Sequence, residues 1–171
     1  MDAVCDSARA QMLAALPRIR RFALALTGNM SDADDLVQDT VERALNNLDK
    51  WTPGTRMDSW MFRIAQNIWV DMLRSRSRRS KFRAEEEEMQ ITSFDGERAA
   101  AASLNLSKTQ KALFELPDEQ RVVIALILLD GMSYRETASI LNIPIGTVTS
   151  RLARARAALA ERVFGVGAQG E

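Results

Sequence analysis

The segment from Ser133 to about Arg162 constrains the fold most, because it carries start and stop signals for two consecutive helices. Ser133, with Glu136 three residues later, is a capping box that begins a short helix. Asn142 favours the left-handed backbone that ends a helix, and Pro144 cannot continue a helix interior. The sequence therefore predicts two helices joined by a tight turn at residues 142–144.

The second of these helices begins near Ile145 and combines an apolar face with a basic one. Its apolar residues recur at helical spacing: Val148, Leu152, Ala155 and Leu159. A longer basic helix after a short turn is typical of a DNA-reading helix-turn-helix. We expect the DNA contacts on the opposite side and its flank, at Thr147, Thr149, Ser150, Arg151, Arg154 and Arg156. An ordinary solvated, arginine-bearing helix face is the alternative interpretation.

The remaining periodic segments also predict helices. Apolar residues repeat at steps of three and four from Leu13 to Leu26, and Gly28-Asn29 ends that helix. Ser31 is expected to cap the next helix, and a third is expected over about 59–76. From about 80 to 100 the apolar period is lost. We predict an all-α chain of two small helical domains, at 8–80 and 102–163, joined by a flexible linker at 81–101.

Composition argues against several classes of protein. The chain has no histidine and one cysteine, which nearly excludes a zinc site of the usual type and excludes an internal disulfide. We find no nucleophile with a recognisable base and no phosphate-cradling glycine loop, so we expect no catalytic residue, no metal and no cofactor. No apolar run approaches the roughly 18 residues of a membrane span, which predicts a cytoplasmic protein.

The net charge of zero hides blocks of opposite sign. Six basic residues and no acid lie between Arg74 and Arg83, and Glu85 to Glu88 follow directly. A second acidic block runs from Asp32 to Glu42. The chain can therefore present one surface to a polyanion and another to a basic partner.

Motifs in both halves resemble those of sigma-70-type factors. Leu116-Pro117, Gly131 to Tyr134 and Ile145 to Arg156 look like region four of that family. Asp34 to Asp39 and Phe62 to Asn67 look like region two. The two sets have the family's order and separation, and the short chain resembles the extracytoplasmic-function (ECF) group. The resemblance implies a protein that binds core RNA polymerase and promoter DNA, directs promoter-specific initiation, and is held by an anti-sigma factor.

The resemblance also implies roles for particular residues. The polymerase would bind the acidic helix face made by Asp34, Asp35, Gln38, Asp39 and Glu42. The minus-ten element would meet Asn67, Arg74, Arg76, Arg78 and Arg79, and the helix-turn-helix residues above would read the minus-thirty-five element. Phe62 or Trp69 could offer a stacking surface, although core packing is the favoured interpretation for Phe62 and Trp60.

Two other functions stay open at this point. A conventional helix-turn-helix regulator would share the C-terminal half, but the N-terminal half shows no phosphoacceptor signature. A sigma-like mimic that only sequesters an anti-sigma factor should lose its DNA-facing basic residues, and this chain retains them. Thr149 and Ala153 stand where several family members carry a basic and a bulkier apolar residue, so the minus-thirty-five sequence cannot be transferred. The run Glu85 to Glu88 is interpreted as a solubilising linker, with mimicry of nucleic acid as the alternative.

Overall fold

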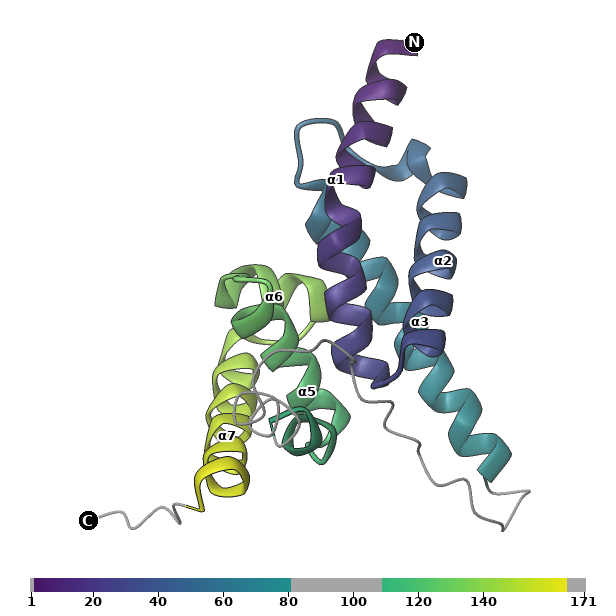
Figure 1. The fold of residues 1–171 in the computed structure, drawn as a ribbon. Coiled ribbons are helices and arrows are strands. Elements are labelled where there is room, and N and C mark those ends of the chain that lie inside the picture. The colour runs from purple at the N-terminus through teal and green to yellow at the C-terminus, as the bar shows by residue number, and fades with distance from the viewer. Residues whose placement is uncertain (1, 81–108, 166–171) are drawn as a thin grey trace, which may run out of the picture. The chain divides into compact units, whose positions relative to one another are not determined.

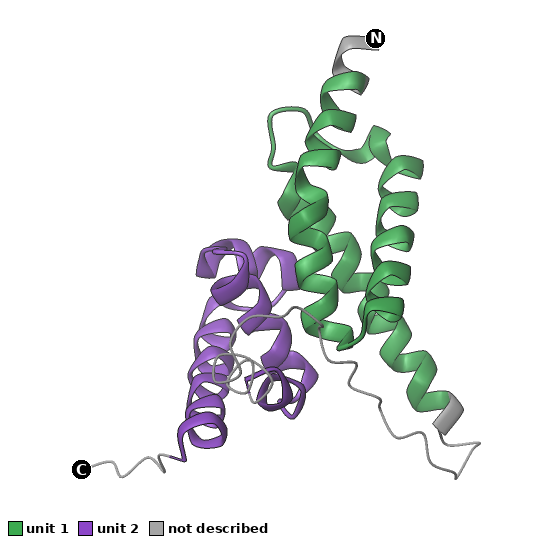
Figure 2. Cartoon of the chain, viewed as in Figure 1, with its two compact units in different colours: residues 1–90 green, residues 91–171 purple. Residues whose placement is uncertain are grey.

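The computed structural model describes residues 2–80 and 109–165, and in these ranges every regular element is helical (Figure 1). The chain divides into two compact units, residues 1–90 and 91–171 (Figure 2). The prediction of an all-α chain with two helical units is confirmed. The predicted linker at 81–101, with Glu85 to Glu88, lies outside the described residues. No described helix is long and apolar enough to cross a membrane.

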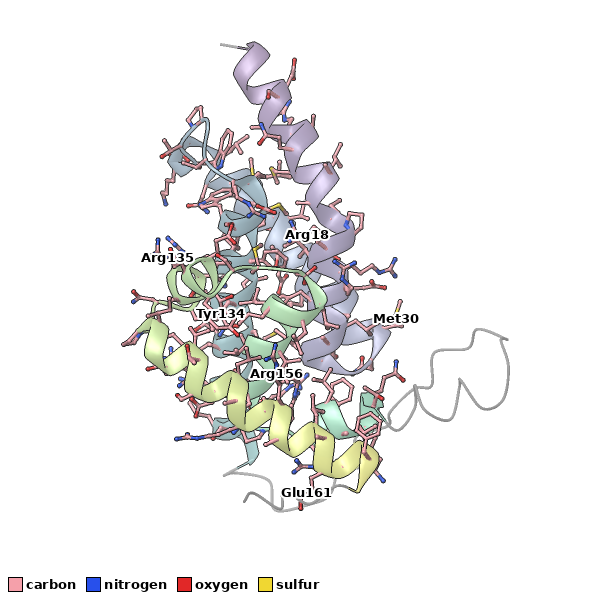
Figure 3. The ribbon with its side chains drawn as sticks, turned by 90° about the vertical axis from the view of Figure 1, so that its left-hand side faces the viewer. Arg18, Met30, Tyr134, Arg135, Arg156 and Glu161 are labelled. Atoms are coloured by element: carbon pink, nitrogen blue, oxygen red, sulfur yellow. The ribbon has the colours of Figure 1, made fainter. Side chains whose placement is uncertain are left out.

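The first unit is a three-helix bundle. It contains α1 (Asp2–Thr27), α2 (Met30–Asn46), the short 3-10 helix η1 (Leu48–Lys50) and α3 (Met57–Ser80). Each of the three long helices packs on the other two. The rings of Phe22 on α1 and Phe62 on α3 meet edge to face, with centroids 5.2 Å apart. The guanidinium of Arg18, labelled in Figure 3, lies over Phe62 and pairs with Asp58, which fixes the start of α3 against α1.

The bounds of α2 and α3 differ from those predicted. Asn29, not Ser31, caps α2, and its side chain accepts a hydrogen bond from the Asp32 amide at 2.8 Å. Gly28 has a φ of +79° and ends α1, so the extended Asn29 that follows already occupies the cap position. The third helix begins at Met57 and ends at Ser80, beyond the predicted 59–76 at both ends.

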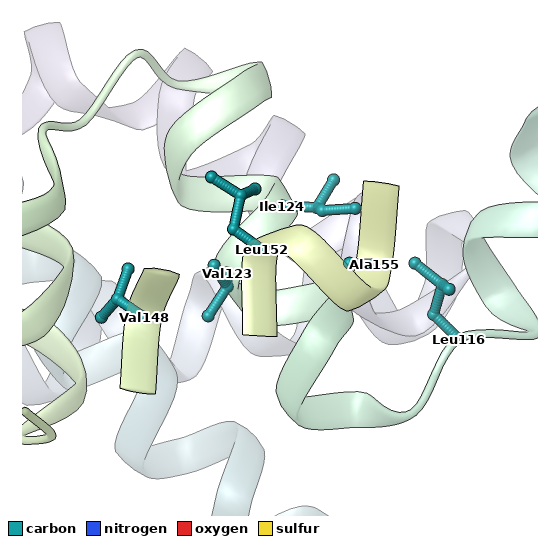
Figure 4. Packing of buried hydrophobic residues seen from close by; sticks show 6 residues of the cluster. All are labelled: Leu116, Val123, Ile124, Val148, Leu152 and Ala155. Carbon is teal, nitrogen blue, oxygen red and sulfur yellow. The ribbon is translucent and has the colours of Figure 1, made fainter. Parts of the chain in front are cut away.

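The second unit contains the predicted helix-turn-helix. Residues 109–114 are helical, and α5 (Asp118–Ile124) continues into η2 (Ala125–Leu129), a turn of π-helix. The helices α6 (Tyr134–Leu141) and α7 (Ile145–Phe164) follow. Six buried side chains from three segments form the core (Figure 4): Leu116, Val123, Ile124, Val148, Leu152 and Ala155. The predicted stripe of α7 is confirmed for its first three members, and Leu159 packs against the cluster while partly buried.

The local signals of the helix-turn-helix are confirmed. The Ser133 hydroxyl accepts a hydrogen bond from the Glu136 amide at 3.2 Å, and the Glu136 carboxylate accepts one from the Ser133 amide at 2.8 Å. Asn142 ends α6 with φ 52° and ψ 48°, the left-handed conformation. Pro144 then occupies the cap position of α7. These contacts fix how α7 leaves α6, and so fix which side of α7 is exposed.

A buried arginine joins α5 to the segment before it. The guanidinium of Arg121 donates to the carbonyl oxygens of Phe114 and Leu116, each at 3.0 Å, and pairs with Asp118 at 3.2 Å. It also lies over the Phe114 ring, 5.2 Å from the centroid. Burial lowers the pKa of Arg121 below that of an exposed arginine, and the negative charge of Asp118 opposes this shift.

Candidate functional site

One side of α2 carries a row of exposed acidic residues. Leu36, Thr40 and Ala44 occupy the buried side of the helix. At about 100° per residue, the opposite side presents the exposed residues Asp35, Gln38, Asp39 and Glu42. Within the described chain, no cation pairs with the three carboxylates of this set. We call these four residues the acidic face.

Asp34 lies beside the acidic face and is paired. Its carboxylate lies 3.0 Å from the guanidinium of Arg20 on α1. A step of 100° per residue turns Asp34 toward α1, away from the middle of the acidic face. This residue therefore has a partner inside its own unit, whereas Asp35 and Asp39 face solvent.

One side of α3 carries cations and an amide without a core contact. Asn67, Arg74 and Arg78 fall within about 40° of one another around the helix, and all three are exposed. We call these three residues the α3 basic face. Two exposed neighbours on the same side, Arg63 and Asp71, were not predicted as site residues. The spacing 63, 67, 71, 74, 78 at steps of four and three would have identified both.

Asp71 introduces a negative charge among these cations. Its carboxylate lies 3.7 Å from the guanidinium of Arg74 and 3.9 Å from that of Arg43 on α2. All three side chains are more than half exposed, so these ion pairs are screened by water and weak. Arg74 can therefore exchange Asp71 for another anion at little cost.

Arg76, which was grouped with these arginines, lies on the opposite side of α3. Its guanidinium is 2.6 Å from the Asp32 carboxylate on α2 and lies over the Trp69 ring, 6.0 Å from the centroid. The hydrogen bond from Asn29, and then the Arg76 ion pair, lower the pKa of Asp32 despite its partial burial. The side chain of Arg79, together with Lys81 and Arg83, lies outside the described residues.

The aromatic side chains of α3 are core residues. Phe62 is completely buried and Trp69 is 2% exposed. Trp60 is only partly buried. Core packing, the favoured interpretation for Phe62, is confirmed, because its ring packs against Phe22 of α1. The ring of Trp69, the other candidate for stacking on a base, is also buried and lies beneath Arg76.

The exposed part of α7 combines hydroxyls, small residues and two arginines, of which Arg154 lies on the outer side and Arg156 on the flank, about 160° around the helix from Arg154. Thr149, Ser150, Arg154 and Arg156 are exposed, and Figure 3 labels Arg156 on this helix. The hydroxyls donate to helix carbonyls, Thr149 to Ile145 at 3.0 Å and Ser150 to Thr147 at 3.1 Å, and keep their lone pairs available. Within the described residues, no carboxylate pairs with Arg154 or Arg156. We call these four residues the reader face.

We expected Thr147 and Arg151 to point away from the core, but neither does so directly. Thr147 is half-buried, and the Arg151 side chain is 26% exposed and pairs with Glu119 in the first turn of α5. Residue 151 lies only about 60° around the helix from Val148, so it borders the apolar stripe. Gly146 and Ala153, which were not predicted as site residues, are exposed on the outermost side instead.

The start of α7 leaves backbone donors available. Pro144 supplies no side-chain cap, although its carbonyl accepts the amides of Thr147 and Val148 at 2.9 and 3.2 Å. The amides of Ile145 and Gly146 precede these bonded ones, and both residues are exposed. Such an end favours an anionic group, which suits a DNA phosphate beside the reader face.

Comparisons with known proteins agree with this arrangement. Residues 12–79 match the family Sigma-70 region 2, and residues 106–159 match Sigma-70, region 4. The ECF RNA polymerase sigma factor EcfG of Rhodopseudomonas palustris is 37% identical over 164 residues, which are 96% of this chain and 89% of that protein. The ECF RNA polymerase sigma factor SigW of Bacillus subtilis is 34% identical over 155 residues, which are 85% of this chain and 83% of SigW.

Solved structures extend the similarity to the fold. The sigma factor RpoE of Bartonella quintana, in complex with the anti-sigma factor NepR, has a TM-score of 0.77 at 35% identity; the match covers 90% of this chain and 94% of RpoE. CnrH, in complex with the cytosolic domain of CnrY, has a TM-score of 0.61 at 28% identity, over 89% of this chain and 94% of CnrH. The anti-anti-sigma factor PhyR of B. quintana shares the fold at 15% identity, over 91% of this chain and 50% of PhyR.

The chain therefore belongs to the ECF group of sigma-70 family RNA polymerase sigma factors. As such it is a non-enzymatic subunit of RNA polymerase that directs promoter-specific transcription initiation. The fold alone would not separate it from an anti-anti-sigma protein, because PhyR shares that fold. The identity to curated sigma factors over almost the whole chain makes the distinction.

Proposed function

We propose that the three exposed faces divide the work of initiation. The acidic face of α2 binds core RNA polymerase, the α3 basic face binds the minus-ten element, and the reader face of α7 reads the minus-thirty-five element. The observation that carries this proposal is the separation of charge: exposed carboxylates on one helix and exposed cations on two others. Domain limits of 8–80 and 102–163, with a linker at 81–101, are part of the proposal.

The acidic face has the chemistry of a docking surface for a basic partner. Its carboxylates have no competing cation among the described residues, so desolvation on binding breaks no ion pair of their own. Gln38 adds an amide that can both donate and accept beside them. Asp34 contributes less in this scheme, because Arg20 already neutralises it.

The two DNA faces act together through the polymerase. Each face offers few contacts, and tethering both to one enzyme raises the effective concentration of the second contact after the first has formed. Arg154 can fork onto guanine, and the hydroxyls of Thr149 and Ser150 accept or donate to bases or phosphates. Arg156 lies on the flank of the reader face, about 160° around the helix from Arg154. Thr147 and Arg151 border the core and contribute mainly by supporting the face.

An anti-sigma factor and a cytoplasmic location complete the proposal. The related sigma factor RpoE was solved with the anti-sigma factor NepR, and CnrH, which shares the fold at 28% identity, was solved with the cytosolic domain of CnrY. A protein of that class would keep this chain from the polymerase until a signal releases it. We expect the chain in the bacterial cytoplasm, because the promoter DNA and the core RNA polymerase that it binds are there.

The test is a double substitution on the acidic face. Gln38→Ala with Asp39→Ala removes two exposed side chains that make no core contact, so the fold should persist while the yield of holoenzyme falls. Asp6→Ala with Asp49→Ala, on exposed positions outside the face, is the matched control. Normal holoenzyme yield from the folded double mutant would reject the assignment of this face.

A further inference from the structure

We propose that Arg76 is a positioning residue: it acts through Asp32 and Trp69 to hold the last turns of α3, and does not neutralise a DNA phosphate. This inference rests on the proposed function, because it concerns how the α3 basic face is aimed. It also removes Arg76 from the set of DNA-contacting residues that the sequence predicts.

The helical register places Arg76 on the core side of α3. Trp69 is buried, and Arg76 follows it seven residues later, two turns along the same stripe. Asn67 lies about 180° around the helix from Arg76. A nucleic acid that contacts Arg74 and Arg78 would therefore meet the face of α3 opposite to Arg76.

The contacts of Arg76 join α3 to the cap of α2. Its Nη2 atom is 2.6 Å from Oδ2 of Asp32, and the same oxygen accepts a hydrogen bond from Nδ2 of Asn29 at 3.1 Å. The amide oxygen of Asn29 accepts from the Asp32 backbone, which is the capping bond of α2. Three side chains thus form one connected group between the start of α2 and the end of α3.

This group lies near the C-terminal end of α3, where it can fix the orientation of the last turns. Trp69 is the last buried core residue of α3 among those described, and from Arg76 to Arg78 every side chain is exposed. Arg74 lies beside the partly buried Met72 and Leu73, whereas Arg78 lies beyond them, where the described side chains of α3 are exposed. The ion pair with Asp32 joins this end of α3 to the start of α2, and the guanidinium also lies over Trp69 of its own helix.

A second interpretation of the same contacts makes the opposite prediction. If Arg76 were a phosphate ligand masked by Asp32, removal of the carboxylate would release the guanidinium and strengthen DNA binding. If Arg76 positions the helix, removal of either partner weakens DNA binding by the same route. The sign of the Asp32→Asn effect separates the two interpretations.

The experiment uses reconstituted holoenzyme and a promoter fragment, mapped with the unmodified protein, that retains only the minus-ten region. Binding is measured against salt concentration for Arg76→Gln, Asp32→Asn, the double variant and the charge swap Asp32→Arg with Arg76→Asp. Arg78→Gln is the matched control on the basic face. Asp49→Asn is the charge control, since residue 49 follows the far end of α2, about 25 Å along the helix from its cap.

We expect Arg76→Gln and Asp32→Asn each to weaken binding about two- to fivefold, the range that an exposed ion pair supports. The double variant should be no weaker than the weaker single variant, and the charge swap should recover most of the loss. The salt slope should stay near that of the unmodified protein, whereas Arg78→Gln should reduce it by about one. Asp49→Asn should leave binding unchanged.

Three results would overturn the role given to Arg76. They are tighter DNA binding by Asp32→Asn, losses of affinity that add up in the double variant, and a salt slope reduced by about one in Arg76→Gln. Thermal unfolding and holoenzyme yield are measured in parallel, and equal amounts of holoenzyme are compared. A loss that affects a minus-thirty-five fragment equally would show a merely structural residue and also overturn the inference. If Arg78→Gln changes neither affinity nor slope, the proposed DNA face of α3 is itself wrong, and the role of Arg76 falls with it.

Discussion

The helices α3 and α7 both present arginines to solvent, but they are built in different ways. On α3 the cations Arg74 and Arg78 lie in the last two turns, where positive charge also stabilises the helix end. On α7 the hydroxyls of Thr149 and Ser150 lie near the first turn, close to exposed backbone amides, and Arg154 follows one turn later.

With the site assignments proposed above, this difference would give one chain two ways to bind DNA. Long cations beyond a bundle core neutralise phosphates with little dependence on sequence. Short side chains near the start of a helix are held closely enough to distinguish base edges. The α3 basic face should therefore set the strength and salt dependence of binding, and the reader face should set the choice of sequence.

The largest expected effect tests whether the reader face depends on the buried arginine of its unit. Arg121→Ala leaves the carbonyls of Phe114 and Leu116 without their donor. An unsatisfied buried acceptor costs about 1–3 kcal/mol, and only the Leu116 carbonyl is fully buried, so we expect the second unit to lose about 2–4 kcal/mol of unfolding free energy. Calorimetry should show a lower transition temperature for the second unit and an unchanged one for the first.

Arg135→Ala, at an exposed position on α6, is the control for this measurement. Equal stability of Arg121→Ala and the control would mean that the buried guanidinium contributes nothing net. The reader face of α7 would then not depend on Arg121 for the stability of its unit.

The next effect concerns the reader face itself. Arg154→Ala should reduce the preference for the native minus-thirty-five sequence over a scrambled one by about 1–3 kcal/mol, the discrimination of one forked arginine. Use of promoters that depend mainly on the minus-ten element should change little. Transcription from paired promoter templates measures both, and equal activity at all of them would remove Arg154 from the reader face.

A smaller effect is expected on α3. Arg74→Gln with Arg78→Gln should lower the slope of log affinity against log salt by about two, because two phosphate contacts are lost. Base preference at the minus-thirty-five element should not change. A change of preference with an unchanged slope would reverse the roles that we assign to the two helices.

The smallest effect follows from the lowered pKa of Asp32. A carboxyl with a lower pKa in the folded state stabilises the fold above its unfolded-state value of about 3.8, and this contribution disappears as pH falls through the folded value. Because the side chain is one-third exposed, we expect less than about 1 kcal/mol. The stability difference between the unmodified protein and Asp32→Asn, measured from pH 6 to pH 2, should vanish at the acid end.

Local signals made the helix-turn-helix predictable from the sequence. The signals are local: each cap or stop involves residues only a few positions apart, so it can be recognised without the tertiary structure. The residues concerned are Ser133, Glu136, Asn142 and Pro144. The same logic failed at Ser31, because Asn29 stood closer to the glycine that ends α1. The π-helical turn at Ala125–Leu129 has no local signal that we can identify.

The partners of the arginines were less predictable. The register alone could have placed Arg76 behind Trp69, since they are seven residues apart on one stripe. That Asp32 and Glu119 are the acids that meet Arg76 and Arg151 follows only from how separate helices pack. That Arg154 is exposed while Arg151 is partly buried also follows only from how the helices pack. The assignment of each exposed residue to a DNA element remains a prediction.

The small residues on the outermost side of α7 have a consequence for divergence. A Cβ added at Gly146 would meet nothing within 4 Å, and Ala153 is exposed. Longer side chains can therefore be acquired at both positions without repacking, and exposed substitutions of this kind change stability by about 0.5 kcal/mol or less. New promoter preferences can arise here by single mutations that the fold tolerates, so a duplicated copy of this protein could acquire a separate set of target genes while its polymerase contacts stay intact.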